Sequence, residues 1–152
     1  MKPNYLTILI TTLCIFFNAC HNSNTAPQLQ LADSLIDKHA DSALCILEKL
    51  SIEEISNKSA KAMYALLLTE ALDKNFKSHR NDSLILIAVD YYKDNSNNKL
   101  KTKAYYYLGR VYQDNKEYIK ATEAYLTALK TASPTQAPIL QRYIKKQIFY
   151  AR

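Results

Sequence analysis

The stretch AYYYLGRVYQDNKEYIKATEAYLTALKTA, from Ala104 to Ala132, decides how the rest of the chain is interpreted. Apolar residues recur in it at helical spacing on both sides of a short polar turn at Asn115–Lys116, which predicts two antiparallel helices. The first of these helices contains Gly109, the only glycine among 152 residues. A glycine inside a helix costs about 0.5–1 kcal/mol relative to alanine, so its position calls for a packing reason.

Seven residues of this stretch are small or apolar and recur where the two helices should meet: Tyr105, Leu108, Gly109, Tyr112, Ala121, Tyr125 and Ala128. Gly109 falls next to Leu108, where the first helix should pass closest to the second, and a side chain there would hold the helices apart. We therefore expect Gly109→Leu to be destabilising through overpacking. We expect Gly109→Ala to be milder or even favourable, because alanine is the better helix former.

The same seven residues resemble the tetratricopeptide (TPR) repeat, whose pattern is aromatic-x2-L-G-x2-Y followed by A-x3-aromatic-x2-A. The best match covers residues 102–135, with Pro134 near the expected end. Two earlier segments repeat the helix-pair pattern in degenerate form; the segment MYALLLTEA, for example, has Leu68 where the repeat has glycine.

Composition favours an all-α fold, because one glycine and four prolines are too few for the turns of an all-β protein. Three helix pairs follow one another at intervals of about 35–40 residues, and repeats of this length indicate a solenoid. The resemblance implies a short right-handed TPR-like solenoid over residues 28–133. Residues 134–152 are expected to form a C-terminal amphipathic helix that caps it.

The N-terminus has the features of a secretory signal. Lys2 precedes a largely apolar run from Tyr5 to Phe17, which is shorter than the roughly 20 residues that span a bilayer. The run ends in FNAC, where Ala19 precedes Cys20, and this resembles a bacterial lipoprotein signal. The resemblance implies cleavage after residue 19, acylation of Cys20 and a polar tether over residues 20–27. An ordinary signal peptide and an uncleaved anchor helix are the alternatives.

The sequence offers little for catalysis or cofactor binding. If Cys20 is acylated, the only thiol left in the mature chain is Cys45, expected to be a small buried apolar residue. No His, Cys or carboxylate group has metal-ligand spacing, and one glycine cannot build a phosphate loop. We therefore expect no enzyme activity, no metal and no cofactor.

Charge is divided unevenly along the chain. From Cys20 to Asn98 there are eight Lys/Arg and eleven Asp/Glu, and from Lys99 to Arg152 there are eleven and three; Lys2 completes the 20 basic residues. A basic C-terminal half suits an acidic protein or anionic lipid as well as a solvated surface. No basic–aromatic run of the kind that follows a nucleic-acid backbone is present, so nucleic acid is not an expected partner.

A binding surface is predicted on the face of the first helix that points away from Leu108 and Tyr112. Four polar or aromatic residues lie there, at Lys103, Tyr106, Arg110 and Gln113. Lys103, Tyr106 and Arg110 share a face because they are spaced i, i+3 and i+7. This row is expected either to receive the carboxylates of an acidic peptide or to be solvated surface, with Tyr106 packed on the neighbouring helix pair.

Lipobox and helix pairs together resemble bacterial TPR lipoproteins. The resemblance implies a scaffold for an unidentified protein or peptide partner, attached by lipid to the cell envelope and facing the periplasm, with the outer membrane favoured over the inner. The alternative is a truncated fragment of a longer TPR sensor or regulatory membrane protein, in which these pairs have only a structural role.

Overall fold

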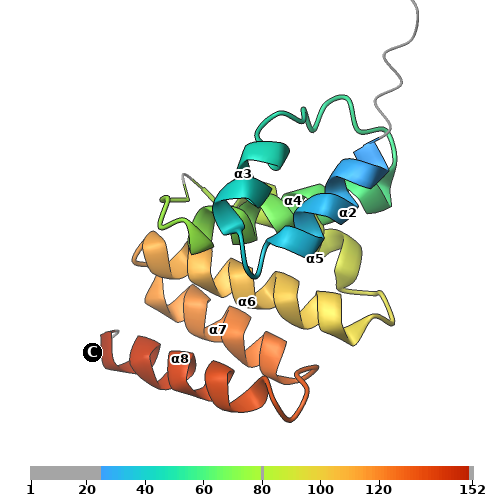
Figure 1. The fold of residues 1–152 in the computed structure, drawn as a ribbon. Helices are drawn as coiled ribbons and strands as arrows, with labels where there is room; N and C mark the ends of the chain where they lie inside the picture. Colours follow the sequence, from blue (N-terminus) through green and yellow to red (C-terminus); the bar gives the residue numbers. More distant parts are fainter. Residues whose placement is uncertain (1–24, 80, 151–152) are drawn as a thin grey trace, which may run out of the picture.

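The computed structural model describes residues 25–79 and 81–150, and within these ranges it contains seven helices and no strand, which confirms the all-α prediction. The helices are drawn in Figure 1, and their bounds are α2 Thr25–Leu35, α3 Ala40–Leu47, α4 Lys58–Lys74, α5 Ser83–Tyr92, α6 Asn98–Asp114, α7 Tyr118–Leu129 and α8 Ala137–Tyr150. The predicted signal sequence over residues 1–19 and the predicted lipidation site Cys20 lie outside the described residues.

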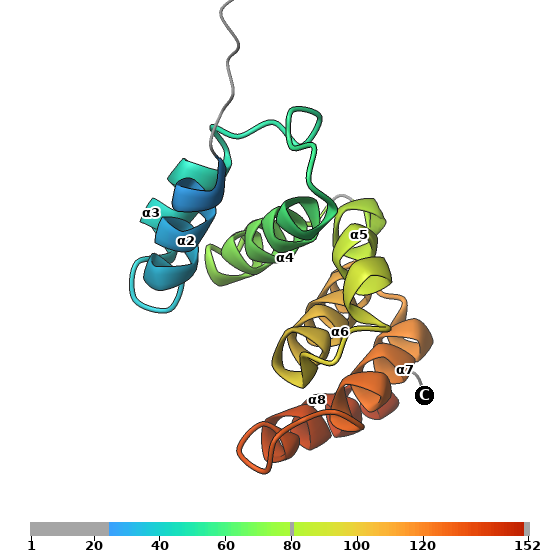
Figure 2. The ribbon, with the colours of Figure 1, turned by 90° about the vertical axis from the view of Figure 1, so that its right-hand side faces the viewer.

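The helices form an extended array. Each helix packs against the next one in the chain, and α2 also contacts α4, which in turn contacts α6. Figures 1 and 2 show the array running from α2 and α3 at one end to α7 and α8 at the other. The first helices of successive pairs therefore lie next to one another along one side, and this placement creates the groove described below.

Helix α4 is buried on several sides because it packs against α2, α3, α5 and α6. The helical period predicts one inward face for it, made of Met63, Tyr64, Leu67, Leu68 and Ala71. Tyr64, Leu67 and Ala71 are buried, whereas Met63 and Leu68 are half-buried. The structure also buries Ala65 and Leu66, which lie outside that predicted face. A single apolar face therefore does not account for the burial of a helix that packs against four others.

Helices α4 and α6 begin in the same way. Asn57 Oδ1 accepts a hydrogen bond from the backbone N–H of Ala60 (3.1 Å), and Asn97 Oδ1 accepts one from that of Leu100 (3.2 Å). Each asparagine satisfies an N–H group that has no partner within the first turn of its helix.

Two predicted boundaries differ from the structure. Helix α2 begins at Thr25, so the last part of the predicted tether is helical; Pro27 fits because first-turn residues need no N–H donor. Helix α8 begins at Ala137, three residues later than the predicted start at residue 134, and places Pro138 in its first turn.

The α6–α7 hairpin has the predicted form. Lys116 adopts a left-handed conformation (φ 62°), and the N–H of Glu117 donates to the carbonyl of Tyr112 (2.8 Å), which closes the end of α6. Gly109 lies against the fully buried ring of Tyr125, and an ideal Cβ on Gly109 would be 2.5 Å from Cδ1 of that ring. This geometry contradicts the expectation that alanine at Gly109 could be favourable, because even one methyl group overlaps the ring.

Cys45 is exposed, whereas the sequence pattern predicts a buried side chain. Its neighbours Ala43, Leu44 and Leu47 take the inward positions of α3, and Cys45 lies on the opposite side of that short helix. No helix within the described residues is long and apolar enough to cross a membrane.

Candidate binding groove

A groove of about 540 Å³ lies between α2, α4, α6 and α8. Three of these are the first helices of the successive pairs, and the fourth is the helix that follows the last pair. Thirteen residues line the groove: Asp33, Ile36, Asp37, Glu70, Lys74, Lys99, Thr102, Lys103, Tyr106, Tyr107, Gln136, Ile139 and Leu140. Its wall therefore combines charged, aromatic and aliphatic side chains from segments far apart in the sequence.

The four predicted groove residues do not share one site. Lys103 and Tyr106 line the groove, but Arg110 lines a separate hollow of about 360 Å³ between α4 and α6. Gln113 accepts a hydrogen bond from the hydroxyl of the buried Tyr125 (3.2 Å) and so belongs to the α6–α7 interface. The predicted row is thus divided among the groove, the smaller hollow and the α6–α7 interface.

Lys103 is paired inside the protein. Its ammonium contacts Glu70 Oε2 and lies 4.0 Å from Asp33 Oδ1. The Glu70 side chain is only 3% exposed, and its other oxygen lies 3.2 Å from Lys74 Nζ. Lys74 also pairs with Asp37 at 2.5 Å, so one network links α2, α4 and α6 across the groove.

This network shifts the pKa values of its outer members. The hydrogen bond from Lys74 is the main reason why the pKa of Asp37 lies below its ordinary value. Burial alone would lower the pKa of Lys74, but its hydrogen bond to Asp37 and the charge of Glu70 raise it. Both groups therefore stay charged at neutral pH.

Arg110 is paired as well. Its Nε and Nη2 both lie 2.8 Å from Asp73 Oδ1, and the two side chains are 21% and 13% exposed. Burial by itself would lower the pKa of Arg110, but the charge of Asp73 outweighs it and raises that pKa. The prediction that Lys103 and Arg110 are available cations is therefore wrong, because both are already paired with carboxylates that come mainly from α4. A partner's carboxylate would have to compete with those internal pairs.

Tyr106 belongs to an aromatic cluster and is not a free anchor. Its ring centroid lies 4.9 Å from that of Tyr107, 6.0 Å from that of Tyr125 and 5.5 Å from that of Tyr143 on α8. Burial and a hydrogen bond with Tyr143 raise the pKa of Tyr106, so its hydroxyl stays protonated at neutral pH. The alternative of Tyr106 packing on a neighbouring helix is the one that the structure supports.

Tyr107 reinforces the same wall from deeper in the protein. It is 5% exposed, and burial together with the negative charge of Glu70 raises the pKa of its hydroxyl. The neutral hydroxyl can donate to the Glu70 carboxylate, which adds to the two ammonium partners of that buried acid.

The acids that pair with these cations are not predicted as site residues from the sequence. Glu70, Asp73 and Lys74 stand at i, i+3 and i+4 in the apolar segment LLLTEALDK, where a polar cluster on one helix face is itself a signal. Asp33 and Asp37, on α2 and just after it, carry no comparable signal, because isolated acids in a polar helix face are usual.

His79 is buried between α4 and α6. Its Nδ1 lies 2.8 Å from Asp114 Oδ2, and its Nε2 lies 3.2 Å from the carbonyl oxygen of Thr69. Contacts at both ring nitrogens thus hold the imidazole in place between the two helices. Ser78 lies next to His79 in the chain, but neither ring nitrogen bonds to its hydroxyl, so the ring does not activate Ser78 as a nucleophile.

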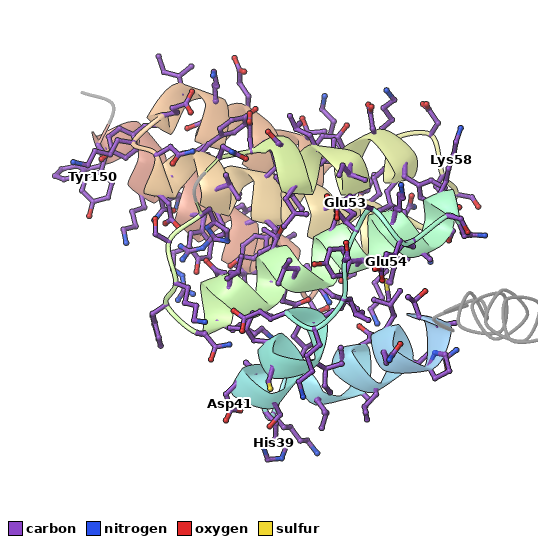
Figure 3. All side chains as sticks on the ribbon, turned by 90° about the horizontal axis from the view of Figure 1, so that it is seen from above. His39, Asp41, Glu53, Glu54, Lys58 and Tyr150 are labelled. Atoms are coloured by element: carbon purple, nitrogen blue, oxygen red, sulfur yellow. The ribbon has the colours of Figure 1, made fainter. Side chains whose placement is uncertain are left out.

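The other carboxylates and histidines of the described residues form no metal site. No group of three or more His, Cys, Asp or Glu side chains within residues 25–79 and 81–150 could hold a metal ion. The adjacent carboxylates Glu53 and Glu54 lie on the segment between α3 and α4 (Figure 3), and Glu53 accepts a hydrogen bond from Ser51 Oγ (2.5 Å).

Comparison with known proteins finds no family model, curated protein or solved structure that matches the chain.

Proposed function

We propose that the protein is a TPR-like scaffold of the bacterial cell envelope that holds an extended segment of a partner protein in the groove between α2, α4, α6 and α8. The groove itself is the observation that carries the proposal. It is formed by the first helices of successive pairs, and the seven TPR-like residues of α6 and α7 support the assignment from the sequence side. The role is binding without catalysis, cofactor or metal.

The groove favours a segment of mixed character. Ile36, Ile139 and Leu140 offer apolar surface, and Ile139 is 48% exposed, so it can gain further burial from a ligand. Lys99 is the groove cation that has no ion pair with another described residue, whereas Lys74 and Lys103 are paired. A partner can therefore place one carboxylate on Lys99 without breaking an internal pair.

The internal ion pairs give the groove a defined shape before binding. Lys103 and Lys74 join α4 to α6 and to the end of α2, and the aromatic cluster around Tyr106 joins α6 to α8. A wall that is already ordered loses little conformational entropy on binding, which favours affinity. This is the role that we assign to Lys103 and Tyr106 in place of direct contact with a carboxylate.

The groove is tested with peptides selected from a random display library on the chain that begins at residue 20. We expect Ile139→Arg to weaken the selected peptides at least tenfold, because it replaces an apolar contact with a bulky charge. The matched control is Leu126→Arg on α7, which changes a residue of similar exposure (45%) outside the groove. Equal binding by the two variants would contradict the assignment of the groove.

The membrane attachment is proposed through acylation of Cys20 and is tested separately. More than one acyl chain, at about 0.8 kcal/mol per buried CH₂, gives stable anchoring. We expect the intact mass of the mature protein to include the lipid, and Cys20→Ser to release the protein from membranes. An unmodified mature Cys20 would remove this part of the proposal and leave the groove untouched.

A further inference from the structure

The start of α7 and the end of α8 meet in an exposed basic and apolar surface. We call it the α7–α8 corner and define it by Lys116, Tyr118, Ile119, Lys146, Phe149 and Tyr150. Lys116, Tyr118, Ile119 and Tyr150 line one hollow of about 410 Å³. The rings of Tyr118 and Tyr150 lie 5.7 Å apart, those of Phe149 and Tyr150 lie 5.8 Å apart, and Lys146 Nζ lies 5.8 Å from the Tyr150 ring centre.

Apolar exposure at this corner is unusually high. Phe149 is 76% exposed and Ile119 is 71% exposed, although the other faces of α7 and α8 bury Tyr125 and Leu140 in a common core. Isolated apolar residues are usual on protein surfaces, but this corner contains two of them together with Tyr150, which is 50% exposed. Burying them against an apolar phase would release a favourable hydrophobic contribution.

The charge around these side chains has one dominant sign. Lys116 and Lys146 have no ion pair with any described residue, and α8 contains no acidic residue. Glu117 and Lys120 also line the hollow, and because they pair with each other their charges offset there. Arg142 and Lys145 extend the basic surface along α8 and are also exposed.

We propose that the α7–α8 corner docks on an anionic phospholipid surface. Ile119 and Phe149 enter the boundary between headgroups and acyl chains, Tyr150 lies at headgroup level, and Lys116 and Lys146 meet the lipid phosphates. Lysine stems and aromatic rings suit this boundary because each has an apolar body and a polar end. A nucleic-acid backbone would satisfy the lysines but would give the exposed isoleucine no apolar contact.

The position of the corner gives the docking a geometric consequence. It lies at the end of the array opposite to α2 (Figures 1 and 2), and Tyr150 projects from the edge of the molecule on the side away from Lys58 (Figure 3). Membrane contact at this end, combined with a lipid on the chain ahead of α2, would lay the array along the membrane.

The test uses the chain that begins at residue 20 and carries Cys20→Ser, so that neither the apolar signal segment nor an acyl chain contributes to binding. All the buried core residues lie at Leu29 or later, so this chain retains the complete core. We expect it to sediment with vesicles containing phosphatidylglycerol, less so as salt is raised, and not with pure phosphatidylcholine vesicles.

The combined variant Lys116→Gln and Lys146→Gln should bind the anionic vesicles about 25-fold more weakly, at about fivefold for each cation near the surface. The matched control is Lys49→Gln with Lys58→Gln, which removes the same charge from exposed lysines elsewhere on the molecule. An equal loss in both variants overturns the proposal. Equally tight binding to a short DNA duplex at the same salt also overturns it, because the corner would then be a general anion-binding surface.

Insertion of the corner into the bilayer can be measured by tryptophan fluorescence, because the chain has no tryptophan of its own. Phe149→Trp places a single reporter at the corner, and its emission should shift to the blue when phosphatidylglycerol vesicles are added. Leu31→Trp, at a half-exposed position on α2, is the control and should show no shift. The absence of a shift from Phe149→Trp, or an equal shift from both reporters, overturns the proposal.

Discussion

Gly109→Ala is the sharpest test of the packing in the α6–α7 hairpin. The added Cβ would lie 2.5 Å from Cδ1 and 2.8 Å from Cζ of Tyr125, whereas carbon atoms in contact are normally about 3.5–4.0 Å apart. The ring must therefore move by about 1 Å, but it is 0% exposed and its hydroxyl is bonded to Gln113.

Two effects of opposite sign decide the result. Overpacking of a well-filled core costs about 1–3 kcal/mol, and replacing glycine by alanine inside a helix returns about 1 kcal/mol. The Tyr125 ring has little room to adapt, so we place overpacking near the top of its range. We expect a net loss of about 1–2 kcal/mol in the free energy of unfolding, measured from urea denaturation of the chain that begins at residue 20.

A double-mutant cycle with Tyr125→Leu isolates the ring contact. Without the ring, Gly109→Ala should become stabilising by up to about 1 kcal/mol, which gives a coupling energy of about 2–3 kcal/mol. The helix-propensity term is measured independently by comparing Glu123→Gly with Glu123→Ala at an exposed position of α7. If Gly109→Ala is as stable as the parent chain or more stable, the close approach of Gly109 to Tyr125 is refuted.

Three further changes test other parts of the structure. His79→Ala should lower the free energy of unfolding by about 1–3 kcal/mol because Asp114 and the carbonyl of Thr69 lose a buried partner, whereas the same change at the exposed His39 should have no effect in denaturant melts. Phe76→Gly should raise stability by about 1–2 kcal/mol, because Phe76 is 98% exposed and holds a left-handed conformation (φ 56°) that suits glycine; an unchanged or lowered denaturation midpoint would contradict this. Asp37→Asn should cost less than about 1 kcal/mol at pH 7, because the Asp37 side chain is largely exposed. The pKa of Asp37 in the folded protein lies below its ordinary value of 3.8. Its contribution to the free energy of unfolding is therefore fully present above pH 3.8 and is lost as the pH falls through the folded-state pKa. Below that pKa, the denaturation curves of the variant and the parent should coincide.

The helical class and the α6–α7 hairpin can be predicted from the amino-acid sequence, because both depend on signals that act within a few residues. The period of Tyr105, Leu108 and Tyr112, and the small residue Gly109 facing Tyr125, specify a close helix pair whatever surrounds it. The turn at Lys116 is equally local, since a helix end is closed by hydrogen bonds within one turn.

Only the tertiary structure decided the state of the predicted binding row. Lys103 and Arg110 have the same helical spacing whether they are solvated, bound to a partner or paired inside the protein. Their acids, Glu70 and Asp73, lie on another helix, and Arg110 is 37 residues from Asp73 in the chain. Helix periodicity determines which side chains share a face but not which helix that face meets. The pairing of charges, the division of the row between two hollows and the exposure of Cys45 therefore follow from how the helices pack, and the local pattern does not contain them.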